Sequence, residues 1–437
     1  MSIEEEVDRL VDERPGRELL VPRYDDPAHR ISDVLYRSGG TTASYCVLTG
    51  RSRVVVNTGL GYEAPHHKRV FDALCPGPTP WIVTTQGHVD HLGGVALFRE
   101  PGTRYVAQER NQACQADDAR IRGLRLRTAG LWFDTTGRDA RRIAAAHPGV
   151  SLHQDTPVPD VTVGSRMDLE VDGLPIELHA AVGETTDSLI VWLPDHRTAL
   201  VSNLLGPLFP HFPNLNTLRG DRYRMVEPYL QSIRTLRSLR PDMLVTGRHD
   251  PVVGSELIDA ALARLHDAVA FVHERTLEGI NAGEDVWTLV RRIELPRHLR
   301  VGQGYGTVAW GVRTIWETYV GWFKLLSSTE LYPDQHTEAM STLVEALGTE
   351  AVVDRARRAL AEHRPVVAVH LAEAVLALEP AHGAAAAVMA GAHARLLADG
   401  GERNFWAHGW LEHERRRWEA LAVAPSTGPP AGDGPAD

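Results

Sequence analysis

The sequence has 437 residues, of which 43% are hydrophobic and 24% charged, as in a globular protein with room for two domains. Its net charge of −11, without a basic block, argues against nucleic acid as a partner. Three widely spaced cysteines form neither a disulfide framework nor a Cys-x-x-Cys metal site, and no secretion signal or membrane-spanning apolar run is seen. These features predict a cytoplasmic protein with no membrane partner.

The first part of the chain predicts an α/β domain. An acidic, amphipathic start belongs to a predicted N-terminal extension, residues 1–30. From residue 31 to residue 201, short runs rich in β-branched and aromatic residues are separated by turn residues. The runs that predict strands include SYCVLTG, SRVVVNTG, WIVTTQG, RYVAQ and DSLIVWLPD. Helical patterns lie between them, and helix dominates from Asp221, so we expect the α/β domain to cover residues 31–295.

The sequence changes character past about Leu295. The stretch YGTVAWGVRTIWETYVGWF carries aromatic residues at helical spacing, which is typical of core or interface packing. Residues 340–397 are rich in Ala, Leu and Val, and two antiparallel helices are predicted on either side of EPAHG. An all-α domain is therefore predicted over residues 296–420. A Pro/Gly-rich tail, residues 421–437, is predicted to be disordered.

The stretch VTTQGHVDHLGG concentrates metal-binding residue types on one turn. His88, Asp90 and His91 follow an apolar strand directly, and a turn can aim side chains at these spacings toward one point. Imidazole and carboxylate together suit zinc, iron or manganese. The alternative is a loop that is merely polar. The neighbouring His66 and His67 are expected at a helix start on the surface.

Two distant residues repeat this placement. Glu184, in VGETTDSLIVWLP, and His249, in LVTGRHDPVVG, each lie where a strand meets a turn. Several such junctions at the ends of strands are what an enzyme site on an α/β scaffold requires. Either residue alone is equally compatible with a structural role at a loop mouth.

These stretches resemble a known family in order along the chain. TTQGHVDHLGG resembles the T-H-x-H-x-D-H-x-G-G signature of the metallo-β-lactamase fold, and GETTDSL is similar to its later G-H-T-x-x-S segment. A glutamate in the position of Glu184 is characteristic of bacterial alkyl sulfatases. NLNTLRG, RHDPVVG, YGTVAWGVRTIWETYVGWF and GERNFWAHGWLE resemble further segments of that family. The resemblance extends from about residue 30 to residue 415, without the family's usual C-terminal sterol-carrier-like domain.

The resemblance implies an αββα sandwich with a metal site at one edge, over residues 31–295, and a helical dimerisation domain that forms a homodimer. It implies two groups of metal ligands, which are Gln86, His88 and Glu184 for one ion and Asp90, His91 and His249 for the other. It also implies that Arg219 binds sulfate, with its planar fork of donors, and that Asn214 and Asn216 in the same motif help to bind the substrate.

The sequence departs from the family at several site positions. Gln86 stands in place of a histidine, and only Ser202 and Asn203 are found where the family has a metal-bridging glutamate. Leu131 and Phe133 replace tyrosines, and Asn57 replaces an aspartate. Two divalent ions would bring four positive charges against two carboxylates, and their repulsion is large at low dielectric.

The charges therefore favour a single ion, or a second ion that is weakly held. The best ligand set for one ion is Asp90, His91 and His249. Such a set suits Zn²⁺, one or two per chain, and also Fe²⁺ or Mn²⁺ if the site is mononuclear.

The leading functional hypothesis is a metal-dependent hydrolase that attacks a small anionic ester, with sulfate esters as first candidates. A metal-bound water would attack, Asp90 and Arg219 would act in catalysis, and His211 would donate a proton to the leaving group or simply lie in a proline-flanked loop. A second hypothesis is a mononuclear enzyme that catalyses a lyase, rearrangement or oxygen-dependent reaction. A third is a degenerate, non-catalytic dimeric binding protein.

Overall fold

The computed structural model describes residues 2–334 and 336–423. The chain divides into two compact units, residues 1–322 and residues 323–437. The first unit holds both β-sheets, and the described part of the second is helical. The predicted α/β fold followed by an all-α region is therefore confirmed. The exact domain boundaries expected from the sequence stay predictions.

The first sheet carries its strands in sequential order. The strands are β1 (His29–Arg30), β2 (Leu35–Ser38), β3 (Ser44–Leu48), β4 (Arg53–Val56), β5 (Trp81–Val83), β6 (Arg104–Gln108) and β7 (Val161–Val163). Pairing is antiparallel from β1 to β4 and parallel from β4 to β7. The carboxyl ends of β4 and β5 therefore lie at the same edge, where the Asn57 loop and the histidine-rich turn begin.

The second sheet faces the first. Its strands in spatial order are β13 (Val252–Val253), β12 (Met243–Thr246), β11 (Thr198–Ser202), β10 (Ser188–Leu193), β9 (Leu174–Ala181) and β8 (Arg166–Val171). Only β11 and β12 pair in parallel. Both of these strands, which precede Asn203 and His249, consequently end at one edge.

Strict alternation of side chains builds the layers. On β4, Val54 and Val56 join the core between the sheets, while Val55 packs in the outer core. On β10, Val191 lies in the inner core and Trp192 in the outer one. Because both faces of these strands are buried, their sequences read as continuous apolar runs. The result is the αββα sandwich that the sequence predicted.

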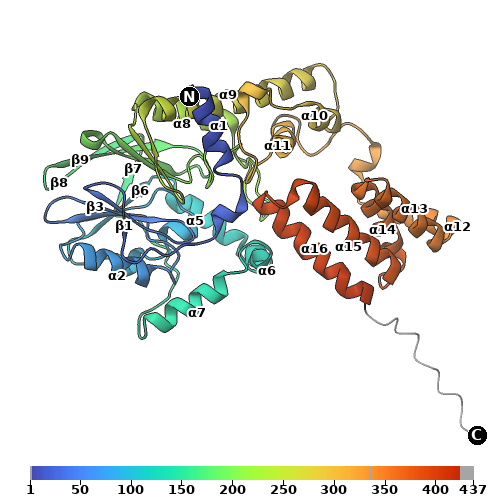
Figure 1. Cartoon of the computed structure of the whole chain (residues 1–437), viewed down its shortest axis with the longest axis horizontal. Coiled ribbons are helices and arrows are strands. Elements are labelled where there is room, and N and C mark those ends of the chain that lie inside the picture. Colours follow the sequence, from blue (N-terminus) through green and yellow to red (C-terminus); the bar gives the residue numbers. More distant parts are fainter. Residues whose placement is uncertain (1, 335, 424–437) are drawn as a thin grey trace, which may run out of the picture. The chain divides into compact units, whose positions relative to one another are not determined.

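Helices cover the outer faces of the two sheets (Figure 1). The first sheet packs against α2 (Ala64–Leu74), α3 (Val89–Leu92) and α4 (Val95–Phe98). The second packs against α8 (Val226–Ser238), α9 (Ser255–Asn281) and α11 (Val308–Val320). The remaining helices of this unit are α1 (Ile3–Asp12), α5 (Asn111–Arg120), α6 (Arg122–Trp132), α7 (Thr136–Ala146) and α10 (Val286–Arg292).

The N-terminal segment is built into the first unit. Val7 and Leu10 of α1 are buried in the core over the second sheet. Asp8 accepts a 2.6 Å hydrogen bond from Arg264 of α9. Arg14 donates to the carbonyl oxygens of Phe209 and Asp250, both at 2.9 Å. α1 is thus a packed helix, whose acidic residues either face solvent or, like Asp8, bind an arginine of the same unit.

The second unit is a stack of short helices. They are α12 (His336–Leu347), α13 (Thr349–Ala361), α14 (Pro365–Leu378), α15 (Gly383–Leu396) and α16 (Phe405–Val423). The predicted helix pair on either side of EPAHG corresponds to α14 and α15, whose core is formed largely by alanine and valine. Most of the predicted disordered tail, residues 424–437, lies outside the described residues. Among the helices that the structure describes, none combines the length and apolar character needed to cross a membrane.

Candidate functional site

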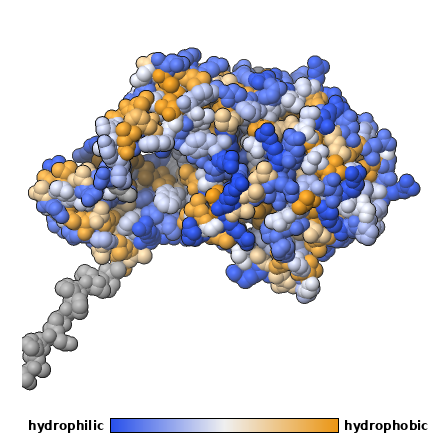
Figure 2. All heavy atoms as spheres, turned by 180° about the vertical axis from the view of Figure 1, so that it is seen from behind, coloured by the Kyte–Doolittle hydropathy of each residue, from blue (hydrophilic) through white to orange (hydrophobic). Residues whose placement is uncertain are grey.

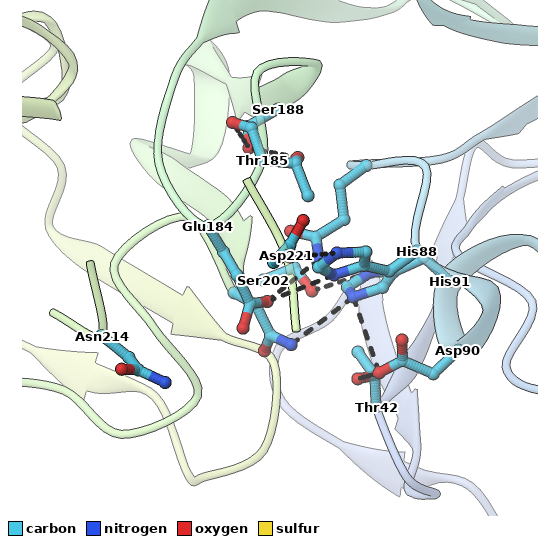
Figure 3. Close-up of polar contacts among 12 residues, drawn as sticks. Thr42, His88, Asp90, His91, Glu184, Thr185, Ser188, Ser202, Asn214 and Asp221 are labelled. Atoms are coloured by element: carbon cyan, nitrogen blue, oxygen red, sulfur yellow. Dashed lines mark hydrogen bonds and ion pairs between the residues drawn. The ribbon is translucent and has the colours of Figure 1, made fainter. Parts of the chain in front are cut away.

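The candidate site lies at the edge of the sandwich where β5, β10 and β11 meet their loops (Figure 3). The turn after β5 contributes Gln86, His88, Asp90 and His91, and His88 is the N-cap of α3. The first turn of α3 therefore carries Asp90, where a carboxylate is favoured by the helix dipole. Polar side chains far apart in sequence meet here, as the strand-to-turn placements predicted.

The glycines after the turn serve helix packing. A Cβ on Gly94 would lie 2.3 Å from Cβ of Ala64, and one on Gly93 would lie 2.5 Å from the backbone nitrogen of Gly61. Real side chains do not tolerate such distances, so α3 can approach α2 only with glycine at these positions.

Gln86, His88 and Glu184 form what we call the amide-bridged group. The amide nitrogen Nε2 of Gln86 lies 2.9 Å from Nδ1 of His88 and donates to Oε2 of Glu184 at 3.0 Å. The direct distance from His88 Nδ1 to Glu184 Oε2 is 3.8 Å. All three side chains are buried. Gln86 therefore fills the space between the imidazole and the carboxylate with a hydrogen-bond donor.

Charged residues surround the amide-bridged group. Nε2 of His88 lies 3.6 Å from Oδ2 of Asp221 and 3.5 Å from Nη2 of Arg219. Arg224 Nη1 lies 3.8 Å from Oε1 of Glu184, and the Tyr305 hydroxyl donates to the same oxygen at 3.3 Å.

These neighbours set the protonation of the group. Although burial opposes it, hydrogen bonding to His88 and the charge of Arg224 hold the pKa of Glu184 well below its ordinary value. Burial alone would lower the pKa of His88, but hydrogen bonding to Asp221 and Glu184 raises it. Asp221, whose pKa is lowered against burial by the same hydrogen bond, stays ionised. The group is a neutralised network of buried charges.

Asp90, His91 and Asn203 form a second group, the half-site. Nε2 of His91 lies 3.8 Å from Oδ2 of Asp90 and 3.5 Å from Nδ2 of Asn203. Oδ1 of Asn203 is buried and has no hydrogen-bond partner in the described part of the chain. Burial lowers the pKa of His91. Burial alone would raise the pKa of Asp90, but the charges of His91 and His88 lower it.

A ring of hydrogen bonds fixes the imidazole of His91. Its Nδ1 lies 3.2 Å from the Thr85 hydroxyl and 3.4 Å from the Ser202 hydroxyl. Asn57 accepts from the Thr85 hydroxyl at 3.0 Å and donates to the Ser202 hydroxyl at 3.3 Å. Asn57 thus lies behind the ligand candidates, as its position in the resemblance implied. This arrangement leaves Nε2 of His91 directed at the half-site.

The two other predicted histidines lie in a different environment. Nε2 of His249 lies 3.1 Å from the carbonyl oxygen of Pro207, and burial together with Arg14 lowers its pKa to about 3. His211 accepts at Nδ1 from the backbone N–H of Gly304 at 3.0 Å and donates from Nε2 to the carbonyl of Arg14 at 2.6 Å. Both ring nitrogens of His211 are therefore used by backbone, which favours a structural role over proton donation.

The predicted substrate-binding residues occupy different depths. Asn214 is buried, its carbonyl accepts from Arg224 at 2.8 Å, and it lies apart from the imidazoles in Figure 3. Asn216 and Arg219 are partly exposed. Arg219 combines access to solvent with a 3.5 Å contact from its Nη2 to Nε2 of His88 in the amide-bridged group.

The fold implies a metal ion, and the half-site offers donor atoms for one. Two ligands of a tetrahedral zinc ion, each bound at about 2.0–2.2 Å, lie about 3.3–3.6 Å apart. The donor atoms of Asp90 and His91 are 3.8 Å apart, close to this spacing, and rotating the Asn203 amide by half a turn would present its unbonded oxygen beside Nε2 of His91. One divalent ion at the half-site would therefore be held by these three residues. Among the described residues, no group of three or more His, Cys, Asp or Glu is disposed to hold a metal.

A second ion at the amide-bridged group stays a prediction that its contacts do not favour. Nε2 of Gln86 already donates to Glu184 and lies 2.9 Å from Nδ1 of His88. The role of His249 as a metal ligand also stays a prediction, since the contact found for its Nε2 is to backbone.

Comparisons with known proteins agree on one type. Residues 288–415 match the family model for alkyl sulfatase dimerisation. A linear primary-alkylsulfatase of Pseudomonas is 27% identical over 312 residues, which cover 68% of this chain and 58% of that protein. The chain is thus similar to alkyl sulfatases. An alkyl/aryl-sulfatase of Saccharomyces cerevisiae is 26% identical over 222 residues, covering 49% of this chain and 33% of that protein.

A solved structure of this type shares the fold. The stereoselective inverting sec-alkylsulfatase Pisa1 of Pseudomonas has a TM-score of 0.76 at 20% identity, covering 91% of this chain and 66% of that one. The predicted resemblance is thereby confirmed. The chain spans about half the length of the curated relatives it matches.

Several residues of the candidate site were missed by sequence reasoning. Asp221 and Arg224 follow Arg219 in LRGDRYR, where alternating charges look like a solvated loop. Tyr305 begins a motif interpreted as packing, and Thr42 precedes β3 in an ordinary turn sequence. No local signal distinguishes them. Only the fold brings them to the turn after β5.

Proposed function

We propose that this chain is a hydrolase of small sulfate esters that uses one divalent metal ion. The observation that supports this most is the half-site, where Asp90 and the Asn203 amide lie beside Nε2 of His91, while Arg219 contacts His88 on the same turn after β5. A cation position next to an arginine that reaches solvent suits an anionic ester. The relatives named as alkylsulfatases give the substrate class.

Asp90, His91 and Asn203 would hold the ion. A divalent ion at such a position supplies Lewis acidity, which lowers the pKa of water and polarises an ester oxygen. The hydroxyls of Thr85 and Ser202 keep the His91 ring in place through its Nδ1. Asp90, ionised at neutral pH, would accept the proton that the attacking water loses.

Arg219 would bind the sulfate group. Its guanidinium is partly exposed and presents paired donors that match two sulfate oxygens. Its Nη2 lies 3.5 Å from Nε2 of His88, which places the guanidinium beside the amide-bridged group. Arg219 would stabilise the negative charge that builds on the departing sulfate in the transition state. Stabilisation of such charge is usually the largest contribution to rate enhancement.

Homodimerisation is part of the proposal. The second unit includes most of the stretch that matches the dimerisation family, and several of its large apolar side chains are more than half exposed. Figure 2 shows one face of the molecule, on which apolar side chains reach the surface between hydrophilic ones. The exposed residues near the start of this unit are Leu325, Leu326, Leu331, Tyr332, Leu343 and Leu347. A second copy of the chain would cover such residues.

The test combines metal analysis with hydrolysis of short-chain alkyl sulfates. Purified without chelator, the protein should retain about one divalent ion per chain, and Arg219→Ala should lower kcat/KM about 100-fold or more. Arg222→Ala is a matched control, because Arg222 lies in the same segment but is exposed and paired with Asp117. No retained metal together with no hydrolysis of any sulfate ester would refute the proposal.

A non-catalytic binding protein is the second candidate. It is favoured by the lack of any group of three His, Cys, Asp or Glu suited to a metal among the described residues. Binding of a sulfate ester without turnover, in protein loaded with Zn²⁺, Mn²⁺ or Fe²⁺, would support this candidate.

A further inference from the structure

Thr42 holds the carboxylate of Asp90. Its hydroxyl donates to Oδ2 of Asp90, as the dashed line in Figure 3 shows. Thr42 is fully buried, and it lies in the short connection between β2 and β3. The same oxygen of Asp90 lies 3.8 Å from Nε2 of His91. The hydroxyl is therefore placed to fix where the half-site carboxylate points.

Glu63 anchors the residue beside Thr42. Its Oε1 accepts from the backbone N–H and the hydroxyl of Thr41, both at 2.7 Å, and from the Tyr24 hydroxyl at 3.0 Å. Its Oε2 accepts from the backbone N–H of Leu60 at 3.0 Å. Glu63 is fully buried. A buried carboxylate is tolerated only with such a set of donors, and here two of the four donors belong to Thr41.

The other end of the connection is fixed by His67. Its Nδ1 lies 2.7 Å from the hydroxyl of Ser38, at the end of β2. His67 is fully buried, and His66 is nearly so, which corrects the expectation that both lie on the surface. A Cβ on Gly40 would lie 3.1 Å from the His67 ring and 3.2 Å from Glu63, so the backbone rests directly on both side chains.

We propose that Glu63 is a positioning residue for the half-site. Residues 38–42, which we call the clamp turn, are tied to α2 by His67 at one end and by Glu63 beside Thr42 at the other. α2 thereby sets the position of Thr42, and Thr42 sets the orientation of the Asp90 carboxylate. The inference rests on the proposed function only for its metal-binding measurement.

The two acceptor oxygens of Glu63 make its hold on the clamp turn specific to a carboxylate. Every contact found for its carboxylate is with a donor, so Glu63→Gln would turn one acceptor oxygen into an N–H donor that faces another donor. The clamp turn would then shift away from α2. Thr42→Val keeps the shape of the side chain but removes the hydroxyl that holds Asp90.

The experiment measures affinity for Zn²⁺ by competition with a chromophoric chelator, well below the melting temperature of each variant. Thr42→Val and Glu63→Gln should each weaken binding about 10-fold to 100-fold, as loss of a ligand's supporting hydrogen bond does. Thr42→Ser, which keeps the hydroxyl, should restore wild-type affinity. A general loss of stability would lower the melting temperature without this pattern.

Thr49→Val is the matched control. Thr49 flanks the other end of β3, is 5% exposed, and donates to Asp172 at 3.0 Å, away from the site. It should keep wild-type affinity. Unchanged affinity in Glu63→Gln and Thr42→Val, or an equal loss in Thr49→Val, would overturn the inference.

Crystal structures of the metal-free variants separate this inference from the proposed function. In Glu63→Gln the clamp turn and the Asp90 carboxylate should be displaced, whether or not the wild type binds metal. If the wild type binds no divalent ion, the proposed function fails while the displacement still decides the inference. An Asp90 carboxylate that keeps its orientation in both variants would refute it.

Discussion

Arg224 is expected to hold the amide-bridged group together, so its removal should cost much stability. Arg224→Ala leaves Glu184 buried while removing a cation at 3.8 Å, an attraction of about 4 kcal/mol at an effective dielectric constant of about 20. It also removes a 2.8 Å charged hydrogen bond to the carbonyl of Asn214. We expect the free energy of unfolding to fall by about 3–5 kcal/mol, the usual result of breaking a buried pair.

The assay is urea unfolding at neutral pH, with Arg222→Ala as the control. Arg222 is exposed and paired with Asp117, so its loss should cost no more than about 1 kcal/mol. The pH dependence gives a second readout. Because the folded pKa of Glu184 lies below its ordinary value of 4.5, its contribution is fully present above about that pH and is lost as the pH falls through the folded pKa.

Without Arg224 the folded pKa of Glu184 moves toward its ordinary value, so the difference between wild type and variant should shrink in acid. A loss below about 1 kcal/mol at neutral pH, or a difference that does not change with pH, would refute the reasoning about this group.

Three further predictions follow from the same contacts. His91→Ala should reduce retained metal to background by mass spectrometry, whereas His249→Ala should leave it unchanged because its Nε2 is bound to the Pro207 carbonyl; equal losses would restore His249 as a ligand. Gly94→Ala should lower the free energy of unfolding by about 1–3 kcal/mol, since the new Cβ would lie 2.3 Å from that of Ala64, and an unchanged value would contradict the packing. Leu331→Glu, at a position 59% exposed, should convert dimers to monomers in sedimentation, and an unaltered sedimentation coefficient would exclude this surface from the interface.

The sequence was most informative about features that depend on neighbouring residues in the chain. Continuous apolar runs such as that of β10 predicted strands buried on both faces, and the polar turn after β5 predicted a site at the strand end. Side-chain direction was beyond its reach. His249 follows an apolar strand as expected, and its Nε2 contacts the Pro207 carbonyl. Its role as a metal ligand stays a prediction, because a residue past a strand end can turn to either side of the sheet.

Charged residues were hardest to interpret from the sequence. Asp221 and Glu63 each have nearby cationic or polar partners that only the fold supplies, so both look like ordinary surface acids in the chain. The acidic first helix was interpreted as an extension, yet it packs on the domain. Its buried side is narrow and includes Val7 and Leu10, so acidic residues dominate its sequence. Pattern predicts which face is apolar, but not whether a polar face meets solvent or a buried partner.

Gln86 explains why two groups so close together need not hold two ions. In its neutral form His88 accepts at Nδ1 from the Gln86 amide, and Glu184 accepts from the same amide nitrogen. When His88 is protonated, it can instead donate toward Glu184, 3.8 Å away. In either state the atoms of His88 and Glu184 that a metal would use are already engaged in hydrogen bonds or ion pairs. Arg224 and Tyr305 contact the remaining oxygen of the Glu184 carboxylate. At the half-site the Thr42 hydroxyl donates to Asp90 and the Asn203 amide nitrogen lies 3.5 Å from His91, but no donor of the described residues links Asp90 to His91 as Gln86 links Glu184 to His88. A cation would link them, and the charge balance favours one ion in this place.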